Sequence, residues 1–216
     1  MRNIIKVPFG VYYYEQFSKP IRRKQDVVSF VLSVVNILLI GREESDVKGT
    51  LWIKKEKMNR VFCFMERKYF SIVFPFDVEW KNVDENKFKV YDPTWDMEID
   101  LRKNALLERM LKEIDFKEKS IDSIIENAYL DVAEEGYANE EIDKCFGLIL
   151  GLLSMELGYI RYDYDPEHEN GTLHPLHHLD INYSSKGTYK LGMNKKIDRD
   201  EFVDMLDIKT ECRFVQ

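Results

Sequence analysis

The sequence predicts an α+β protein in which antiparallel sheet is combined with a buried N-terminal helix and a central helical segment. Three observations support this class. A nearly continuous apolar run covers residues 27–40, short segments with period-two alternation follow over residues 50–99, and apolar residues at helical spacing continue over residues 107–157. Period two places alternate side chains on opposite faces of a strand, whereas a spacing of three or four places them on one face of a helix.

The chain has 216 residues and a mass of 25.8 kDa, which is enough for one large domain or two small ones. No internal repeat, long linker or abrupt change of composition divides it. We therefore expect a single α+β domain over 1–216. If this domain has two lobes, the natural division is 1–100, with the buried helix and a β-meander, and 101–216, with helices and a three-stranded sheet.

The apolar run near the N-terminus predicts a helix over residues 24–40, after Pro20. Its apolar part, residues 27–40, has 14 residues, fewer than the roughly 20 that a membrane-spanning helix requires. The run also carries a narrow polar stripe at a spacing of three or four residues, formed by Asp26, Ser29, Ser33 and Asn36. These features indicate a helix buried on most of its surface in a protein core, so we expect no contact with a membrane.

Six segments after this helix have the composition of strands and are separated by connections of hairpin length: 50–54, 60–65, 69–76, 77–80, 87–91 and 97–99. They predict an antiparallel meander rich in aromatic residues. The spacing of apolar residues then predicts helices over 107–114, 121–132 and 139–157.

The last part of the chain returns to alternating patterns, which predict strands over 159–164, 177–184 and 188–193. A final helix follows, and its start has a clear signature. Asp198 and Glu201 have the spacing of a capping box, and Ile197 can pack against Phe202 as a hydrophobic staple.

Composition excludes several classes of protein. The hydrophobic content of 44% and the net charge of −7 do not fit a disordered or collagen-like chain. The three cysteines are far apart and form no Cys-x-x-Cys pair, which argues against a disulfide framework or a cysteine zinc site and favours a cytoplasmic location. The sequence also contains no glycine-rich phosphate-binding motif and no Gly-x-Ser-x-Gly nucleophile motif.

Charge is unevenly distributed along the chain. Residues 1–70 carry 14 basic and 7 acidic side chains, whereas residues 71–216 carry 18 basic and 32 acidic ones. Part of the basic excess lies at Arg22, Arg23 and Lys24. Such asymmetry is typical of a phosphate-binding surface or a docking face for an acidic protein, and it is also compatible with ordinary solvated charge.

All four histidines lie within eleven residues, at positions 168, 174, 177 and 178. Alternation in the neighbouring strands sorts the side chains into two faces. If the last three strands pair, one face is apolar. The other face gathers acids, cations and an imidazole, namely Arg161, Asp163, Asp165, His178, Asp180, Asn182 and Lys190, with His168 and His174 in the loop above.

Three interpretations of this group stay open. A divalent metal (Zn²⁺, Mn²⁺ or Fe²⁺) can be held by imidazole and carboxylate, and the candidate ligands are His174, His178, Asp180 and Asp165. Without a metal, a histidine can act as a general acid or base beside an orienting carboxylate. In the third interpretation the imidazoles only stabilise the backbone of a long loop. The spacing fits neither of the histidine metal motifs His-Glu-x-x-His and His-x-His-x-Asp-His.

The same region resembles an uncharacterised bacterial family, a domain of unknown function (number 2290) with an R-x-D…HPxxHL core near its C-terminus. The matching segments are Arg161–Pro166 (RYDYDP), His174–Asp180 (HPLHHLD) and Tyr189–Gly192 (YKLG). Some members lie near mobile-element or phage-defence genes. The resemblance implies that His174 and His178 act together, with Arg161 and Asp163, but it implies no activity.

These observations predict a cytoplasmic bacterial protein, in a defence setting if the resemblance holds, whose C-terminal sheet binds a phosphate-bearing ligand such as a nucleotide or nucleic acid. Metal-assisted phosphoester hydrolysis, as in a phosphoesterase or nuclease, is the reaction that the residue types favour. The catalytic candidates are His174, His178 and Asp180. The candidate ligand-binding residues are Arg161, Asp163, Lys190 and Asn182. The alternative is a non-catalytic regulatory subunit that docks on a protein partner through Arg22, Arg23 and Lys24.

Overall fold

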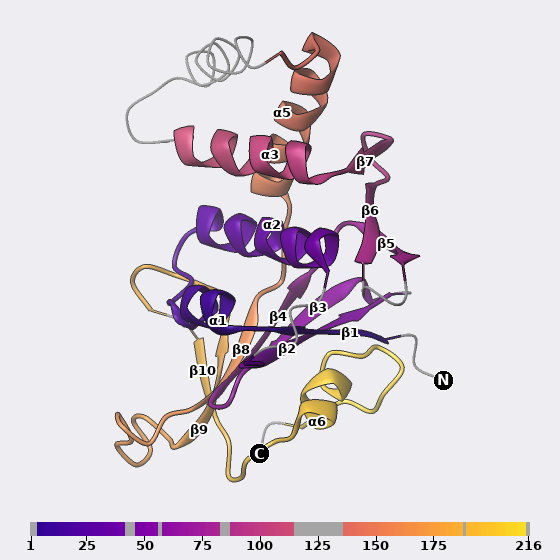
Figure 1. Cartoon of the computed structure of the whole chain (residues 1–216). Coiled ribbons are helices and arrows are strands. Elements are labelled where there is room, and N and C mark those ends of the chain that lie inside the picture. Colours follow the sequence, from indigo (N-terminus) through magenta and orange to yellow (C-terminus); the bar gives the residue numbers. More distant parts are fainter. Residues whose placement is uncertain are drawn as a thin grey trace. The chain divides into compact units, whose positions relative to one another are not determined.

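The computed structural model describes residues 4–41, 46–55, 58–82, 87–114, 136–187 and 189–214, and it confirms the α+β class (Figure 1). The described residues form two antiparallel sheets, one of seven strands and one of three. They group into two compact units, each built from separate stretches of the chain. The first comprises Met1–Arg23, Arg42–Pro75 and Glu156–Gln216, and the second comprises Lys24–Gly41 and Phe76–Met155. The boundaries of these units differ from the two lobes expected from the sequence, 1–100 and 101–216.

The first unit contains the seven-stranded sheet and the helices α1 (Val11–Ser18) and α6 (Arg199–Asp204). Every neighbouring pair of strands in the sheet is antiparallel. The spatial order of the strands is β1 (Ile4–Phe9), β2 (Gly49–Lys54), β3 (Arg60–Phe64), β4 (Lys68–Val73), β8 (Ile160–Tyr164), β9 (His177–Ile181) and β10 (Tyr189–Gly192).

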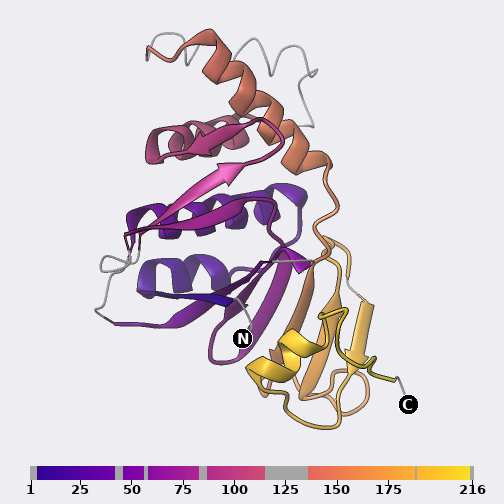
Figure 2. The same cartoon turned by 90° about the vertical axis from the view of Figure 1, so that its right-hand side faces the viewer.

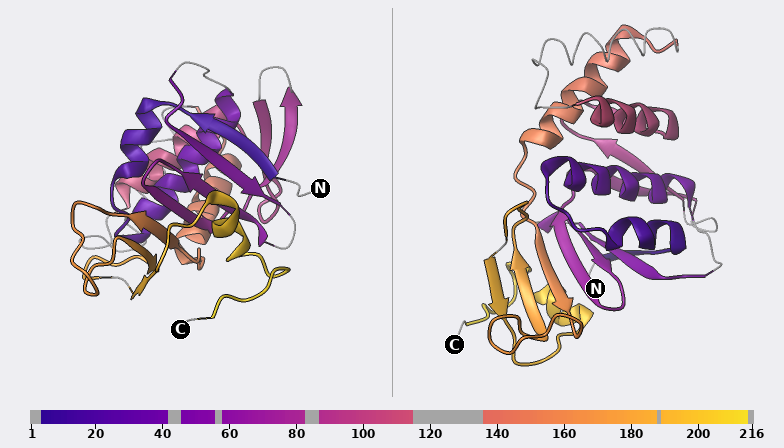
Figure 3. Two further views of the ribbon diagram at one scale, coloured as in Figure 1. Left: turned by 90° about the horizontal axis from the view of Figure 1, so that it is seen from below. Right: turned by 90° about the vertical axis from the view of Figure 1, so that its left-hand side faces the viewer.

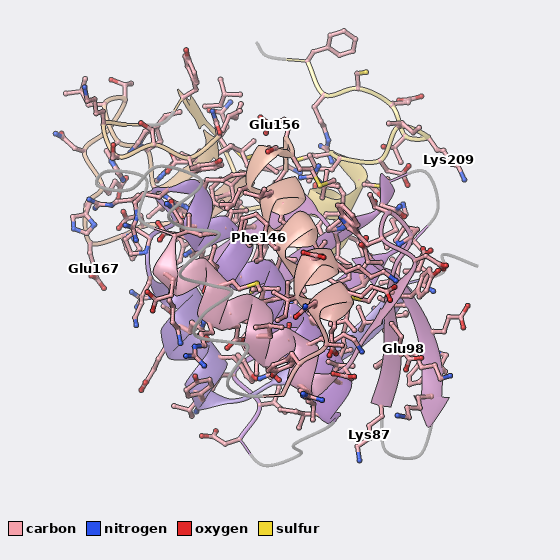
Figure 4. All side chains as sticks on the ribbon, turned by 90° about the horizontal axis from the view of Figure 1, so that it is seen from above. Lys87, Glu98, Phe146, Glu156, Glu167 and Lys209 are labelled. Carbon is pink, nitrogen blue, oxygen red and sulfur yellow. The ribbon has the colours of Figure 1, made fainter. Side chains whose placement is uncertain are left out.

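The second unit contains the three-stranded sheet and three helices. The strands are β5 (Asp77–Asn82), β6 (Lys87–Asp92) and β7 (Met97–Ile99), and the helices are α2 (Lys24–Ile40), α3 (Leu101–Glu113) and α5 (Asn139–Ser154). Figure 4 labels Lys87 and Glu98 on the strands of this unit and Phe146 on α5. The predicted helix over 121–132 lies outside the described residues.

Helix α2 has the predicted bounds and is buried over most of its length. One residue of its polar stripe bonds within the helix, since the Ser33 hydroxyl donates a hydrogen bond of 2.9 Å to the Ser29 carbonyl. Among the described residues, none of the helices is both long enough and apolar enough to pass through a membrane.

The predicted meander is divided between the two sheets, which corrects its expected continuity. Strand β4 ends at Val73, and the next strand, β5, begins the second sheet at Asp77. Pro75 lies between the two strands and lacks the N–H that a ladder needs, so it favours a break at this point. The sequence analysis also missed β1 and α1. In α1, three consecutive tyrosines, Tyr12–Tyr14, obscured the helical period.

Helix α6 packs on one face of the large sheet, near β8 and β9 (Figure 2). The capping box is confirmed: the Asp198 carboxylate accepts from the Glu201 N–H at 2.8 Å, and the Glu201 carboxylate accepts from the Asp198 N–H at 3.0 Å. Ile197 and Phe202 are both fully buried in the core cluster of this face. The apolar face of the last three strands is therefore covered at Tyr162 and Leu179, whereas Ile181 and the apolar side chains of β10 stay exposed. Their polar face lies on the opposite side of the sheet.

Candidate functional site

Strands β8, β9 and β10 lie side by side in the large sheet (Figure 3, right), and their register brings the predicted polar side chains together. Arg161 pairs with Asp180, and Asp180 pairs with Lys190 on its other side. Asp163 pairs with His178 in the same way. Residues directly opposite each other in an antiparallel ladder point to the same face, so these five residues share one face of the sheet, as the alternation predicted.

Arg161 joins the two carboxylates at the centre of the group. Its Nε donates to Asp163 Oδ2 at 2.6 Å, and its Nη2 donates to Asp180 Oδ2. Burial by itself lowers the pKa of the Arg161 guanidinium, but the negative charge of Asp163 and Asp180 and the neighbouring Tyr159 outweigh this effect and raise it. The guanidinium is therefore a fixed positive charge in the site.

His178 is held in one orientation by the backbone. The side chain is almost completely buried, and its Nδ1 lies 2.9 Å from the Pro175 carbonyl oxygen. Because a carbonyl can only accept, Nδ1 carries the hydrogen of this bond. The other ring nitrogen, Nε2, faces Asp163 Oδ2 at 3.6 Å, which is too long for a hydrogen bond.

One carboxylate oxygen of the resulting group lacks a partner. Asp163 and Asp180 both bond to Arg161, and they lie opposite Lys68 and Lys190 in the neighbouring ladders. Asp180 is 3% exposed, and its Oδ1 is buried without a hydrogen-bond partner among the described residues. Ligand atoms of Asp163, His178 and Asp180 all lie within 4.8 Å of one another. A cation at this position would satisfy the unpartnered Asp180 oxygen.

His174 and Asp165 form a second cluster with different contacts. His174 Nε2 lies 3.1 Å from Asp165 Oδ2, and its Nδ1 lies 3.1 Å from Lys190 Nζ. The Lys190 ammonium can only donate, so Nδ1 accepts and Nε2–H donates to the carboxylate. Both nitrogens of His174 are thus already bonded to protein. Asp165 also accepts from His168 Nδ1 at 2.9 Å.

The hydrogen bonds from the two histidines change the pKa of the Asp165 carboxylate. Partial burial raises the pKa of Asp165, but the hydrogen bonds from His168 and His174 outweigh it and lower the pKa below the ordinary value. The two clusters touch, because the rings of His174 and His178 are perpendicular with centroids 4.7 Å apart. The four expected metal ligands are therefore divided: His178 and Asp180 lie in the first cluster with Asp163, and His174 and Asp165 lie in the second.

The loop between β8 and β9, residues 165–176, positions both clusters. It is closed by a hydrogen bond of 3.0 Å from the Asp165 N–H to the Leu176 carbonyl. Within it, the Asn170 N–H donates to the His174 carbonyl at 2.8 Å. The loop thereby brings the His174 ring to Asp165 and the Pro175 carbonyl to His178.

Two residues of this region lie outside the clusters. Asn182, a predicted ligand-binding residue, follows the end of β9 with a left-handed φ of 65° and is exposed. Its Oδ1 accepts from the Tyr183 N–H at 2.8 Å. His177 is on the opposite face, stacked between Tyr162 and Tyr164, and burial followed by the charge of Lys196 lowers its pKa.

The sequence analysis did not identify Lys68 as part of this region. Lys68 lies on β4, opposite Asp163 in the β4–β8 ladder. Its ammonium donates to the Phe17 carbonyl at 2.9 Å, at the C-terminal end of α1. Burial, together with the charge of Arg161, lowers the pKa of Lys68 to about 8. No local signal shows this role, because it depends on β4 pairing with a strand about 90 residues later in the chain.

Comparison of the chain with protein-family models, curated proteins and solved structures found no significant match. The resemblance to an uncharacterised bacterial family stays a prediction.

Proposed function

We propose that this protein binds a divalent transition metal through Asp163, His178 and Asp180 and uses it to bind and hydrolyse a phosphate-bearing ligand. The observation that carries the proposal is the convergence of one imidazole and two carboxylates within 4.8 Å, together with a buried, unpartnered Asp180 oxygen. A buried polar atom without a partner is unfavourable, and a cation at this position would satisfy it.

The donor set suits the proposed metal. One histidine nitrogen with two carboxylate oxygens is a ligand combination found for Zn²⁺, Mn²⁺ and Fe²⁺, and three protein ligands leave a position for water or substrate. The Pro175 carbonyl fixes the tautomer of His178 that leaves Nε2 as the ligand atom. Asp180 can keep Oδ2 on Arg161 and offer Oδ1 to the ion, so the guanidinium would orient the carboxylate.

The surrounding residues support chemistry on a phosphate. A metal ion lowers the pKa of a bound water and polarises a phosphoryl oxygen. Lys190 is exposed and lies opposite Asp180, so its ammonium can attract the anionic group toward the site. His174, oriented by Asp165 and in contact with the His178 ring, is the candidate for proton transfer to the leaving oxygen. This role requires that Lys190 leave His174 Nδ1 and bind the phosphate instead.

Metal content of the purified full-length chain tests the proposal. After equilibration with Zn²⁺ or Mn²⁺ and removal of excess ion, mass spectrometry should find about one ion per chain in the wild type. His178→Gln and Asp180→Asn should lose the ion. His177→Gln is the matched control, because it removes a neighbouring imidazole from the opposite face of the sheet. Equal, negligible metal in the wild type and all variants would end the proposal.

Hydrolysis is tested separately with bis(p-nitrophenyl) phosphate as a generic phosphodiester. The metal-loaded wild type should release p-nitrophenolate, and His174→Ala should bind metal normally but react more slowly. Metal binding without turnover on this probe would restrict the proposal to a binding site.

The non-catalytic alternative, docking on an acidic protein through Arg22, Arg23 and Lys24, stays a prediction. Arg22 and Arg23 are exposed, whereas the Lys24 ammonium donates to the Met155 carbonyl at the end of α5. Charge reversal at Arg22 and Arg23 therefore tests docking with less disturbance of α2 than reversal at Lys24. Loss of a stoichiometric partner in the double variant, with no effect of His178→Gln, would favour this alternative.

A further inference from the structure

A pocket of about 390 Å³ lies beside the two clusters, near helix α1, where β3 and β8 end and β4 begins. This volume is within the roughly 300 to 1,000 Å³ typical of small-molecule sites. The pocket is lined by Tyr14, Ser18, Met65, Arg67, Lys68, Tyr164, Asp165, Pro166 and Glu167. Figure 4 labels Glu167 on the loop that follows β8. All of these residues belong to the first compact unit.

The lining combines three kinds of chemistry. Tyr14, Tyr164 and Met65 offer aromatic and sulfur surface, on which a planar ring packs well. Arg67 and Lys68 carry positive charge. The Lys68 ammonium already donates to the Phe17, Ser18 and Lys19 carbonyls at 2.9, 3.5 and 3.3 Å, so it acts on an anionic group through its charge. Arg67 Nη1 is 2.8 Å from Glu167 Oε1, and both side chains are largely exposed, so this ion pair lies at the solvent side of the pocket. An exposed pair of this kind contributes little to stability and can open for a ligand.

Two lining residues connect the pocket to the clusters. Asp165 lines it and also holds the His174 and His168 rings. Lys68 lines it and lies opposite Asp163, a ligand of the proposed metal. A molecule that fills the pocket therefore extends toward the group of carboxylates and imidazoles, and the carboxylate of Asp165 can accept from amino groups on such a molecule.

We infer that this pocket binds a nucleoside monophosphate with an amino-bearing base, as the ligand of the proposed metal site. The planar base packs against the tyrosines and Met65, and an exocyclic amine donates to the acidic lining residues. The phosphate lies toward the metal ligands, where Lys68 contributes positive charge but no free N–H. This inference rests on the proposed function for the position of the phosphate, whereas the base-binding part depends only on the pocket. The volume favours a single nucleotide over a nucleic-acid strand.

Calorimetric titration of the full chain with AMP, UMP and ribose 5-phosphate tests the inference, first in chelator and then with Mn²⁺. AMP should bind saturably in both conditions, and ribose 5-phosphate should bind at least about tenfold more weakly, since stacking of one base accounts for an effect of this size. UMP, which has no exocyclic amine, should be intermediate. Tighter binding of AMP with Mn²⁺ is expected if the phosphate reaches the metal.

Tyr14→Ala should weaken AMP binding about tenfold. Tyr12→Ala is the matched control, because Tyr12 lies on the same helix, is 73% exposed and does not line the pocket. Absence of saturable AMP binding in both conditions, or equal effects of the two substitutions, would overturn the inference.

The two proposals fail in distinguishable ways. Metal uptake with no binding of AMP removes the pocket inference and leaves the metal site. AMP binding in chelator with no metal uptake removes the metal site and leaves the base-binding pocket. A nucleic-acid ligand is indicated instead if a single-stranded oligonucleotide binds at least tenfold more tightly than AMP and Tyr14→Ala weakens it, and that result would also overturn the mononucleotide assignment.

Discussion

Replacement of Arg161 by methionine tests whether the buried carboxylates can accept a metal ion in place of the guanidinium. Arg161 bonds to Asp163 and Asp180, and all three side chains are less than one fifth exposed. Removing one partner of a buried ion pair costs roughly 3 to 5 kcal/mol, because the remaining charge stays buried without compensation. For a chain of this length, that loss lowers the melting temperature by about 6 to 20 °C.

A divalent ion should reverse much of this loss. Arg161→Met removes one positive charge from beside the two carboxylates, so the ion is attracted more strongly to the variant than to the wild type. An ion present at about 100 times its dissociation constant stabilises the folded state by about 2.7 kcal/mol. We therefore expect Zn²⁺ to raise the melting temperature of Arg161→Met by several degrees, and by more than it raises that of the wild type.

Thermal unfolding followed by circular dichroism, in chelator and in a Zn²⁺ series, measures both effects. Arg161→Met with Asp180→Asn is the control, since it removes one carboxylate and should lose the response to the ion. This reasoning is refuted if Zn²⁺ raises the melting temperatures of the wild type, Arg161→Met and the double variant equally. It is also refuted if Arg161→Met melts at the same temperature as the wild type in chelator.

Three further predictions concern stability. The hydrogen bond from buried Lys54 lowers the pKa of Asp207 in the folded state below its ordinary value of 3.8. The ionised Asp207 therefore adds to the free energy of unfolding. This contribution is complete above pH 3.8 and is lost as the pH falls through the folded-state pKa. Urea unfolding at pH 7 and pH 3 should show a larger acid-induced loss in the wild type than in Asp207→Asn, and equal losses would contradict this origin. Phe202→Ala should lower the free energy of unfolding in urea by roughly 3 to 5 kcal/mol, because the ring is fully buried against three other aromatic rings. A loss below about 1 kcal/mol would mean that Phe202 does not anchor α6 to the sheet. Asp198→Ala should cost about 1 kcal/mol by removing the helix cap, with Asp200→Ala, in the first turn of the same helix, as the comparison.

The sequence predicted the C-terminal strands and their faces well, because each depends on a local pattern. Alternation along 159–164 and 177–184 assigned Arg161, Asp163 and Asp180 to one face, and the register of β8 and β9 places them there. Asn182 was assigned to the same face, but the strand ends at Ile181, before the alternation does.

The choice of partners within the site could not be predicted in this way. The sequence grouped His174 and Asp165 with His178 as metal ligands, whereas the structure bonds His174 to Lys190 and Asp165. Which carboxylate faces which ring depends on how the loop of residues 165–176 closes, and no periodicity encodes that closure.

By itself, the sequence determined the class of the fold, the buried helix over 24–40, the capped final helix and the gathering of charged side chains on one face of the last three strands. These features follow from the side-chain period of helices and strands and from capping contacts between near neighbours. Only the tertiary structure decided that β4 pairs with β8, that Lys68 lies opposite Asp163, and that the pocket forms beside Asp165. The physical reason is that pairing between distant strands is selected by the packing of the whole sheet, which no short stretch of residues contains.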